Sequence, residues 1–317
     1  MHLVPQDTHL NFLGHRNKAF VFSVVLLLVA VGSLVFRGLN FGIDFTGGTL
    51  VEVAYSEAVS VGEVRADLHE AGFNQAVVQT FGAPTDILVR VPTANGRDTA
   101  SVSSGILNAL RSGAGEGGSV EMRRVEFVGP QVGEELAKQG LMAMLYALIG
   151  ILIYVAWRFE LRFAVGSVAA LLHDVVITLG VFSVTGLEFD LPVVAAILAV
   201  IGYSLNDTIV VFDRIRENLR KMRRADTEEV MNESVNQTMA RTVVTSTTTL
   251  LVLLSLFFLG GAVIHGFATA LITGVIIGTY SSIFVGAPLA LILGVSRGDL
   301  MGRKPSEEPE AGEAHGP

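Results

Sequence analysis

The sequence predicts an α-helical integral membrane protein with six transmembrane helices and one small α+β domain outside the membrane. Half of the 317 residues are hydrophobic, only 16% are charged, and the mean hydropathy is +0.55. A soluble domain carries about a quarter charged residues, so this chain lacks the surface composition of one. The segment 37–137 is polar enough to fold in water and lies between the first two apolar stretches.

Six apolar stretches are long enough to cross a bilayer, which takes about 20 helical residues at a rise of about 1.5 Å each. They are Lys18–Phe36, Leu141–Trp157, Phe163–Val184, Leu191–Phe212, Val243–Gly261 and Ile264–Leu293. The first stretch follows basic residues, as the hydrophobic region of a signal peptide would, but it is too long for one. We therefore expect it to remain as a transmembrane helix.

The distribution of Lys and Arg over the loops predicts the orientation of the helices. The loops after the second and fourth stretches and the C-terminal tail carry basic residues, whereas the loops "TGLEFD" and "GGAVIHG" carry none. We expect both termini in the cytoplasm and the domain on the opposite side of the membrane. The expected parts are a cytoplasmic N-terminus (1–17), the first helix (18–36), the α+β domain (37–137), the bundle of helices two to six (138–296) and a disordered cytoplasmic tail (297–317).

Alternating apolar residues predict four strands in the domain, at "TLVEVAY", "QAVVQTF", "DILVRV" and "SVEMRRVEF". Helical spacing ending in glycine predicts helices at "SVGEVRADLHEAG" and "RDTASVSSGILNALRSG". The order βαββαβ is that of the split βαβ, or ferredoxin-like, sandwich. Many activities share this fold. Because no His/Asp/Glu pattern typical of a metal site occurs in it, we expect a docking or moving part without catalytic function.

Composition and missing motifs argue against an enzyme. The chain has no cysteine, which excludes disulfides and thiolate catalysis. Its net charge is −8, so the composition does not indicate a basic surface that would bind nucleic acid. Neither H-E-x-x-H nor G-x-S-x-G occurs. An intramembrane aspartyl protease would need Asp174 and Asp207 to share a proton, which a nearby arginine would suppress. We expect no enzymatic activity, no metal and no organic cofactor.

Asp207, in "GYSLNDTIVV", is an ionisable residue within the fourth apolar stretch. Such residues are rare in membranes and mark ion paths, proton relays or buried pairs. At about 100° per residue, Asp207 shares a helix face with Tyr203 and Ser204, and Asn206 lies beside it. This face is small and polar, so we expect Asp207 to point into the bundle.

Arg241 opens the fifth stretch and is the expected partner of Asp207. Thr245 and Thr248 continue its stripe one and two turns further along the helix. An antiparallel hairpin would bring Arg241 to the cytoplasmic third of the fourth helix. The pair would respond to a proton by shifting the helices. The alternative is a static buried pair that fixes helix register.

Further polar or small residues in the bundle support weaker hypotheses. His173 and Asp174 in "LLHDVV" extend a proton path or only brace the bundle, and as neighbours on a helix they should not line one path together. Small residues recur every four positions in the sixth stretch and indicate close helix packing: Gly266, Ala270, Gly274, Gly278 and Ser282. The segment "FGIDFTGGT", residues 41–49, reads on composition as a turn-rich lead into the first strand of the domain.

Five motifs together resemble the SecF family of bacterial protein translocase subunits, a branch of the SecD/SecF group in the resistance-nodulation-division superfamily. They are "FGIDFTGGT", "VGPQVGEEL", "LHD", "GYSLNDTIVVFDRIREN" and "SVNQTMARTVVTSTTTL". The resemblance implies a multi-pass protein of the bacterial inner (plasma) membrane, embedded in lipid, with one periplasmic domain. It also implies pairing with SecD, association with the SecYEG channel and gradient-driven pulling of a translocating preprotein.

The resemblance assigns the family's intramembrane aspartate to Asp207 and its arginine in the fifth helix to Arg241. Asp213 matches a second family aspartate and is expected to order the basic helical segment that follows it. The resemblance leaves open whether the coupling ion is H⁺ or Na⁺. Two other functions stay open as well, a scaffold that holds SecD and the channel together without ion coupling, and a stand-alone antiporter of small molecules or lipids.

Overall fold

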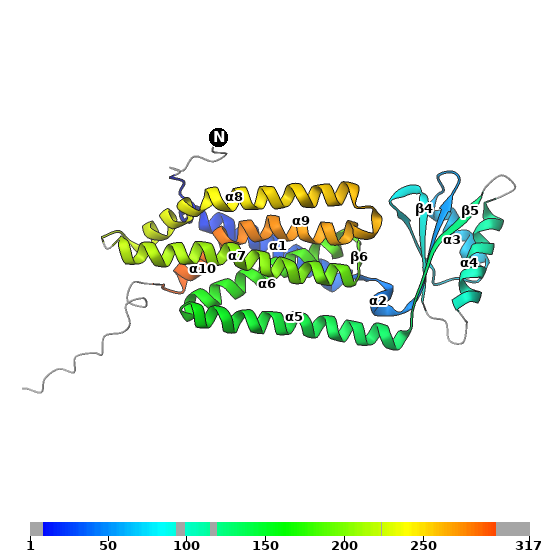
Figure 1. The fold of residues 1–317 in the computed structure, drawn as a ribbon, viewed down its shortest axis with the longest axis horizontal. Coiled ribbons are helices and arrows are strands. Elements are labelled where there is room, and N and C mark those ends of the chain that lie inside the picture. Colours follow the sequence, from blue (N-terminus) through cyan, green and yellow to red (C-terminus); the bar gives the residue numbers. More distant parts are fainter. Residues whose placement is uncertain (1–8, 93–98, 115–118, 223, 296–317) are drawn as a thin grey trace, which may run out of the picture.

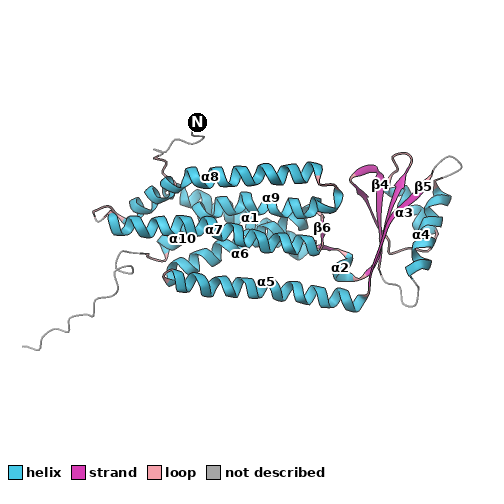
Figure 2. Ribbon diagram, in the orientation of Figure 1, coloured by secondary structure: helices cyan, strands magenta, loops and turns pink. Residues whose placement is uncertain are grey.

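Among the described residues, six helices are long and apolar enough to cross a membrane. The long helices lie side by side, and the α+β domain projects from one end of the bundle they form (Figure 1). The computed structural model describes residues 9–92, 99–114, 119–222 and 224–295. The predicted disordered tail, 297–317, lies outside the described residues. Figure 2 shows that strands are confined to the domain and to the region where it joins the bundle.

All six predicted apolar helices are present, and each is long and apolar enough to cross a membrane. The bounds are α1 Arg16–Phe36, α5 Pro130–Arg158, α6 Leu161–Thr185, α7 Leu191–Lys221, α8 Thr227–Leu259 and α9 Ala262–Ser281, with the short η1 Leu13–His15 before α1. Three of the helices, α5, α7 and α8, extend beyond the apolar stretches, because helix-forming polar residues continue them past the hydrocarbon region. The basic segment after Asp213 is part of α7 as far as Lys221.

The sixth span is not one regular helix. After α9 comes a five-residue π-helical turn, η2 Ser282–Gly286, followed by α10 Ala287–Ile292. Pro288 has no N–H group to continue the ladder, and its ring clashes with the carbonyl of residue 284 in a regular α-helix. The wider turn just before the proline relieves this conflict.

Three helices form the inside of the bundle. In α6, α7 and the α9–α10 span, more than half of the apolar window is buried, whereas in α1, α5 and α8 less than a fifth is buried. The predicted small-residue ridge of α9 packs on α7. A Cβ atom at Gly274 would overlap the side chain of Val200, and one at Gly278 would lie 3.0 Å from the Cβ of Ser204. The absence of side chains at these positions brings α7 and α9 close together.

The domain contains the four strands and two helices in the predicted order. They are β2 Gly48–Tyr55, α3 Val61–Glu70, β3 Val77–Phe81, β4 Ala83–Val91, α4 Thr99–Gly113 and β5 Val120–Val128. The strands form one antiparallel sheet in the order β3-β4-β2-β5. Val53 and Val89 face a core shared with Leu68 of α3 and Ile106 of α4. Because side chains alternate along strands, Leu50 and Leu88 face the other side, toward the bundle.

A small junction that the sequence analysis did not predict joins the domain to the bundle. Residues 41–49 were predicted to be a turn-rich lead into the first strand of the domain. They also include the end of strand β1 Asn40–Phe41 and the one-turn helix α2 Ile43–Thr46, both of which precede β2. Strand β1 pairs in parallel with β6 Glu188–Phe189, which lies in the loop between α6 and α7. In Figure 1, α2 and β6 lie between the sheet and the ends of the helices.

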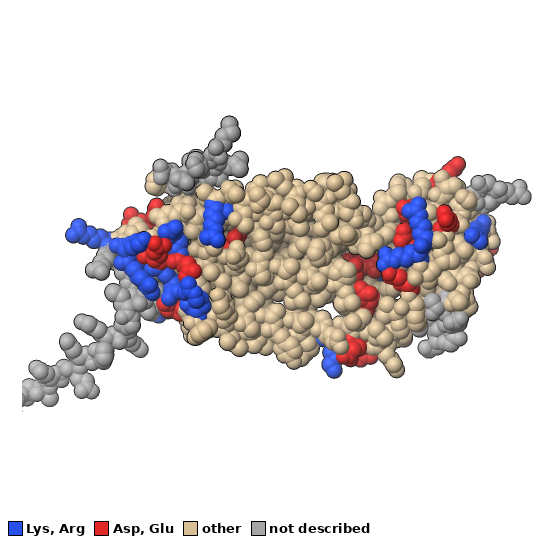
Figure 3. Space-filling model, in the orientation of Figure 1, with Lys and Arg blue, Asp and Glu red and all other residues tan. Residues whose placement is uncertain are grey.

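Charged side chains gather at the two ends of the molecule (Figure 3). On the face shown, the band between these ends carries none, and this band covers the helices of the bundle. An uncharged band flanked by charged ends is the surface of a protein that spans a bilayer.

We predict that Gly274→Ala destabilises the bundle, because the added methyl group overlaps Val200 and separates α7 from α9. Overpacking of this kind costs about 1–3 kcal/mol. Thermal unfolding of the full chain in detergent measures the effect, with Gly150→Ala on α5 as the control, since a Cβ there meets nothing within 4 Å. Equal melting temperatures for the two variants would contradict the packing described here.

Candidate functional site

Asp207 lies on α7 and is buried, with 3% of its surface exposed. It points into the bundle, as the small polar face of the helix predicted. In the part of the chain that the structure describes, its Oδ2 atom has no hydrogen-bond partner. A buried carboxylate oxygen without a donor is costly, and such a group favours the arrival of a proton, a cation or a donor from elsewhere.

Arg241 lies on α8, near Asp207 but not in contact with it. Its positive charge acts on the Asp207 carboxylate. Among the ion pairs of the described residues, none joins Asp207 to Arg241, and Arg241 is exposed on the outside of the bundle. The expected direct ion pair is therefore not formed in this structure, because α8 turns Arg241 toward the surface.

The polar stripe of α8 that faces the bundle differs from the predicted one. Thr248 is exposed and Thr245 half-buried, and their hydroxyl groups donate to carbonyl oxygens of their own helix. Thr242 and Ser246 point inward instead. Ser246 Oγ accepts a hydrogen bond from Tyr203 Oη at 3.3 Å and lies 2.7 Å from a hydroxyl group of α9. Helical periodicity groups residues into faces, but it does not say which face meets a neighbour.

The sequence suggested that Asn206 supports Asp207, but Asn206 does not point into the bundle. It is exposed, because adjacent residues on a helix point about 100° apart and Asp207 points inward. Ala199 and Gly202 are exposed on the same side of α7. The outer surface of α7 thus carries a strip of small and polar residues at a depth where lipid-facing side chains are normally apolar.

Asp174 is the carboxylate that the bundle satisfies most fully. It is 1% exposed, and three groups bind it. Its Oδ2 accepts hydrogen bonds from Ser204 on α7 at 2.6 Å and from Ser281 on α9 at 2.7 Å, while its Oδ1 lies 2.9 Å from His173 Nδ1. This cluster joins α6, α7 and α9. Sequence reasoning named Asp174 and Ser204 but did not bring them together, and Ser281 was missed.

His173 and Asp174 lie in one polar network, although adjacent positions on a helix point about 100° apart. That they do not line one path together stays a prediction. The side chains bend toward each other, although their Cα–Cβ bonds diverge. The His173 ring stacks on Tyr280 at 6.3 Å, and Tyr280 Oη donates to the carbonyl oxygen of Ala19 on α1. His173 Nε2 has no hydrogen-bond partner among the described residues.

Asp213 acts between helices and not only within the basic segment of α7. Both of its carboxylate oxygens accept hydrogen bonds from Arg158 Nη2 at the end of α5, at 2.9 and 3.2 Å. Arg216, one turn further along α7, lies 3.8 Å away. Asp213 is partly exposed, so this contact joins α5 to α7 at the end of the bundle far from the domain.

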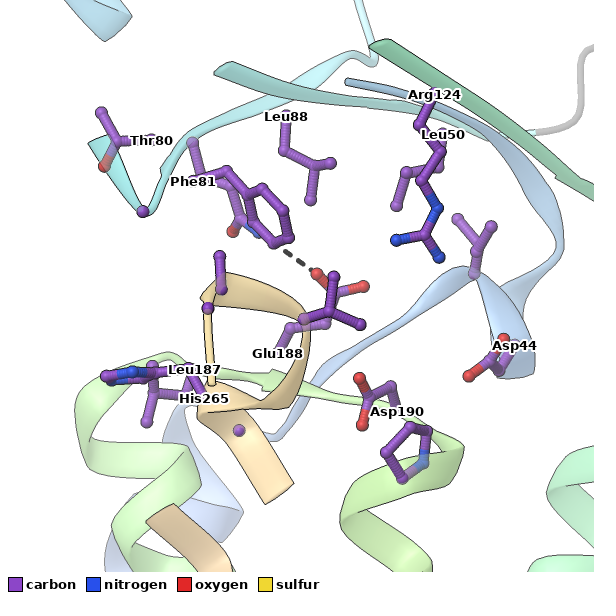
Figure 4. A pocket seen from close by; sticks show the side chains of 18 of the residues that line it. Asp44, Leu50, Thr80, Phe81, Leu88, Arg124, Leu187, Glu188, Asp190 and His265 are labelled. Atoms are coloured by element: carbon purple, nitrogen blue, oxygen red, sulfur yellow. Dashed lines mark hydrogen bonds between the residues drawn. The ribbon is translucent and has the colours of Figure 1, made fainter. Parts of the chain in front are cut away.

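A cavity of about 800 Å³ lies between the sheet and the near end of the bundle (Figure 4). Leu50 and Leu88 point into it from the sheet, and Glu188 and Asp190 from the bundle. Nowhere in the described ranges do three or more His, Asp or Glu side chains come close enough to hold a metal ion. Among the described residues, the bundle buries two carboxylates: Asp174, which three groups bind, and Asp207, one oxygen of which lacks a donor.

Comparison with protein families gives two matches. The family model described as "Protein export membrane protein SecD/SecF, C-terminal" matches residues 110–296. The model described as "SecD/SecF GG Motif" matches residues 32–59, which include the junction helix α2 and its two following glycines. Together they cover the bundle from α5 onward and the region where the chain leaves α1 for the domain.

Curated relatives match over nearly the whole chain. The protein translocase subunit SecF of Vibrio alginolyticus is 49% identical over 311 residues, which cover 98% of each chain. The SecF of Magnetococcus marinus is 52% identical over 296 residues, covering 92% of this chain and 94% of the relative.

Solved structures of SecDF share the fold. SecDF from Thermus thermophilus, described as a translocon-associated membrane protein, matches with a TM-score of 0.83 and 39% identity. The match covers 92% of this chain but only 39% of that SecDF chain. SecDF in a super-membrane-facing form matches with a TM-score of 0.68 and 42% identity. The chain therefore belongs to the SecF family of protein translocase subunits.

Proposed function

We propose that this chain works with a SecD partner to couple the proton or sodium gradient to SecYEG-dependent protein export across the bacterial inner membrane. The observation that carries the proposal is Asp207, a buried carboxylate in a membrane-spanning helix with an oxygen that no described group binds. Arg241 supports it, since its charge acts on Asp207 without an ion pair that would hold the carboxylate permanently. An intramembrane carboxylate in such surroundings is suited to bind and release a cation.

Protonation of Asp207 would remove a negative charge that now interacts with Arg241, and so change the balance between α7 and α8. The close contact of α7 with the glycines of α9 would let α7 shift along that surface. One charge crossing 100 mV supplies about 2.3 kcal/mol. Each cycle can therefore bias only a modest conformational difference, which favours many small pulls on the preprotein.

The exposed strip on α7 and α8 supports a SecD partner. Gly202 and Asn206 on α7 and Arg241 and Thr248 on α8 are exposed at membrane depth, where contact with lipid would be unfavourable. The matching SecDF chain is much longer than this one, so most of it has no counterpart here. We propose that a SecD partner covers this strip and supplies polar groups near Asp207.

The loop charges support an orientation with both termini in the cytoplasm and the domain in the periplasm. We assign the domain the ferredoxin-like arrangement, with α3 and α4 on the side of the sheet that faces away from the membrane. In this orientation the preprotein is engaged on the periplasmic side. The chain then acts as a transport subunit without enzymatic activity of its own.

Gradient-driven export in membrane vesicles that hold this chain with its SecD partner tests the coupling role. We expect Asp207→Asn and Arg241→Met to lower export by about tenfold or more, since a coupled charge carries about 2.3 kcal/mol per 100 mV. Glu217→Gln, which removes a partly exposed carboxylate that pairs only within the same helix, is the control and should retain most of the export. Full export by Asp207→Asn in a normally assembled complex would reject ion coupling at Asp207 and favour the scaffold function.

Cysteine accessibility tests the orientation, because the chain has no cysteine of its own. A membrane-impermeant maleimide added from the periplasmic side should label Glu70→Cys on α3. It should label Lys221→Cys, at the end of α7, only after the inner membrane is opened. The reverse pattern would place the domain in the cytoplasm and contradict the proposed transport direction.

A further inference from the structure

Four contacts from the domain side converge on the short segment Glu188–Leu191, directly before α7. The carbonyl oxygen of Phe189 accepts a hydrogen bond from the N–H of Gly42 at 2.8 Å, next to the β1–β6 pairing. Glu188 Oε2 accepts one from Gln79 on β3 at 3.2 Å, which Figure 4 marks. The two others come from Arg90 and Asp44. The helix that carries Asp207 thus begins where the domain touches the bundle.

Asp44 binds the first N–H group of α7. The first four N–H groups of a helix have no partner within the helix and attract carboxylates. Asp190, the N-cap residue, accepts a hydrogen bond from Val193 N at 2.9 Å, as an ordinary capping aspartate does. Asp44 Oδ2 accepts one from Leu191 N, also at 2.9 Å. The second carboxylate at this helix end comes from α2, 147 residues away in the sequence.

The helix that carries Asp44 leads directly into β2 and packs on the start of α5. Gly47 and Gly48, which follow α2, have φ angles of 67° and 133°, a region that favours glycine. A Cβ atom at Gly47 would lie 2.9 Å from the Cα of Pro130, at the start of α5, and one at Gly133 would lie 2.9 Å from Gly47 N. The chain entering β2 is therefore packed closely against the start of α5, at the point where the chain has just left β5, so α2 is held where both β2 and β5 meet the bundle.

Arg90 on β4 makes the other polar contact with the segment before α7. Its side chain is 8% exposed and forms an ion pair with Glu188 at 2.9 Å. It also donates a hydrogen bond to the carbonyl oxygen of Phe41 at 2.6 Å. A buried arginine that holds both strands of the small β1–β6 sheet fixes the sheet of the domain over this point.

We propose that Asp44 is a positioning residue that couples α7 to the α+β domain, so that a displacement of α7 moves the domain through α2 and the paired glycines. Only the cause of the α7 displacement, a change of charge at Asp207, rests on the proposed function. The contact itself is independent of the ion.

The junction is also sensitive to pH through Asp190. Burial, together with the nearby carboxylates Glu188 and Asp44, raises the pKa of Asp190 from 3.8 to about 6, against the opposing hydrogen bond from Val193. Other charged or titratable groups line the same cavity, namely Arg124 and Glu126 on β5 and His265 on α9, and Arg90 binds Glu188.

Because the folded state raises this pKa, protonation of Asp190 stabilises the fold fully below about pH 3.8, and this contribution is lost as pH rises through about 6. We predict that the melting temperature of the full chain falls between pH 5 and pH 7. Asp190→Asn, which keeps a capping side chain, should flatten this dependence, and His265→Gln controls for the histidine. An unchanged slope in Asp190→Asn would reject Asp190 as the source.

The test of Asp44 uses the full chain with its SecD partner in lipid nanodiscs. Spin labels at Glu70→Cys on α3 and Ser255→Cys on α8 report the distance between the domain and the bundle, and hydrogen exchange reports the Leu191 amide. We expect Asp44→Ala to broaden the distance distribution and to speed exchange at Leu191 by about tenfold, since the N–H loses a charged acceptor. Asp44→Asn keeps an acceptor oxygen and should restore both. Asp86→Ala removes a carboxylate that pairs with Arg123 within the domain and is the matched control.

An unchanged distance distribution in Asp44→Ala would overturn the proposal, as would equal broadening in Asp44→Ala and Asp44→Asn, because the hydrogen bond would then not be the link. Neither measurement requires an ion gradient. If Asp44→Ala loosens the junction while Asp207→Asn exports normally, the coupling by Asp44 stands and the proposed role of Asp207 fails.

Discussion

A carboxylate inside a membrane bundle has no water to bind, and the core of this protein is arranged around that constraint. Asp174 is tolerated because donors from three helices reach it, His173 on α6, Ser204 on α7 and Ser281 on α9. These short hydroxyl side chains reach the carboxylate only if the helices lie close together. Gly274 and Gly278 allow that approach, so the small-residue ridge and the buried charge depend on each other.

Asp207 lies one turn from Ser204 on the same helix, and one of its oxygens lacks the donors that Asp174 has. The difference separates two uses of a buried carboxylate. Asp174 is bound by three groups and joins the inner helices, whereas one oxygen of Asp207 has no donor and the charge of Arg241 acts on it from a distance. This difference between the two carboxylates supports the proposal that Asp207 is the one that binds a mobile cation.

The junction gives α7 a second role besides holding Asp207. Its first N–H groups are bound by Asp190 from its own chain segment and by Asp44 from the domain side. A helix end held in this way transmits a displacement along its axis to whatever carries the second carboxylate. The glycines after α2 and the packing on α5 extend that connection to the sheet, which explains physically why a Gly-Gly pair is suited to this position.

Local patterns in the sequence determined the six membrane-spanning helices, the strands and helices of the domain, the small-residue ridge of α9 and the inward direction of Asp207. Each of these depends on periodicity or length within one segment, which the residues of that segment decide by themselves. The tertiary structure alone decided that α8 presents Thr242 and Ser246 to the bundle and turns Arg241 and Thr248 outward. It alone brought Ser281 to Asp174 and Asp44 to Leu191, over 107 and 147 residues. The rotation of a helix about its axis and the contacts between distant segments are set by how the helices pack together, and one helix's periodicity carries no information about its neighbours.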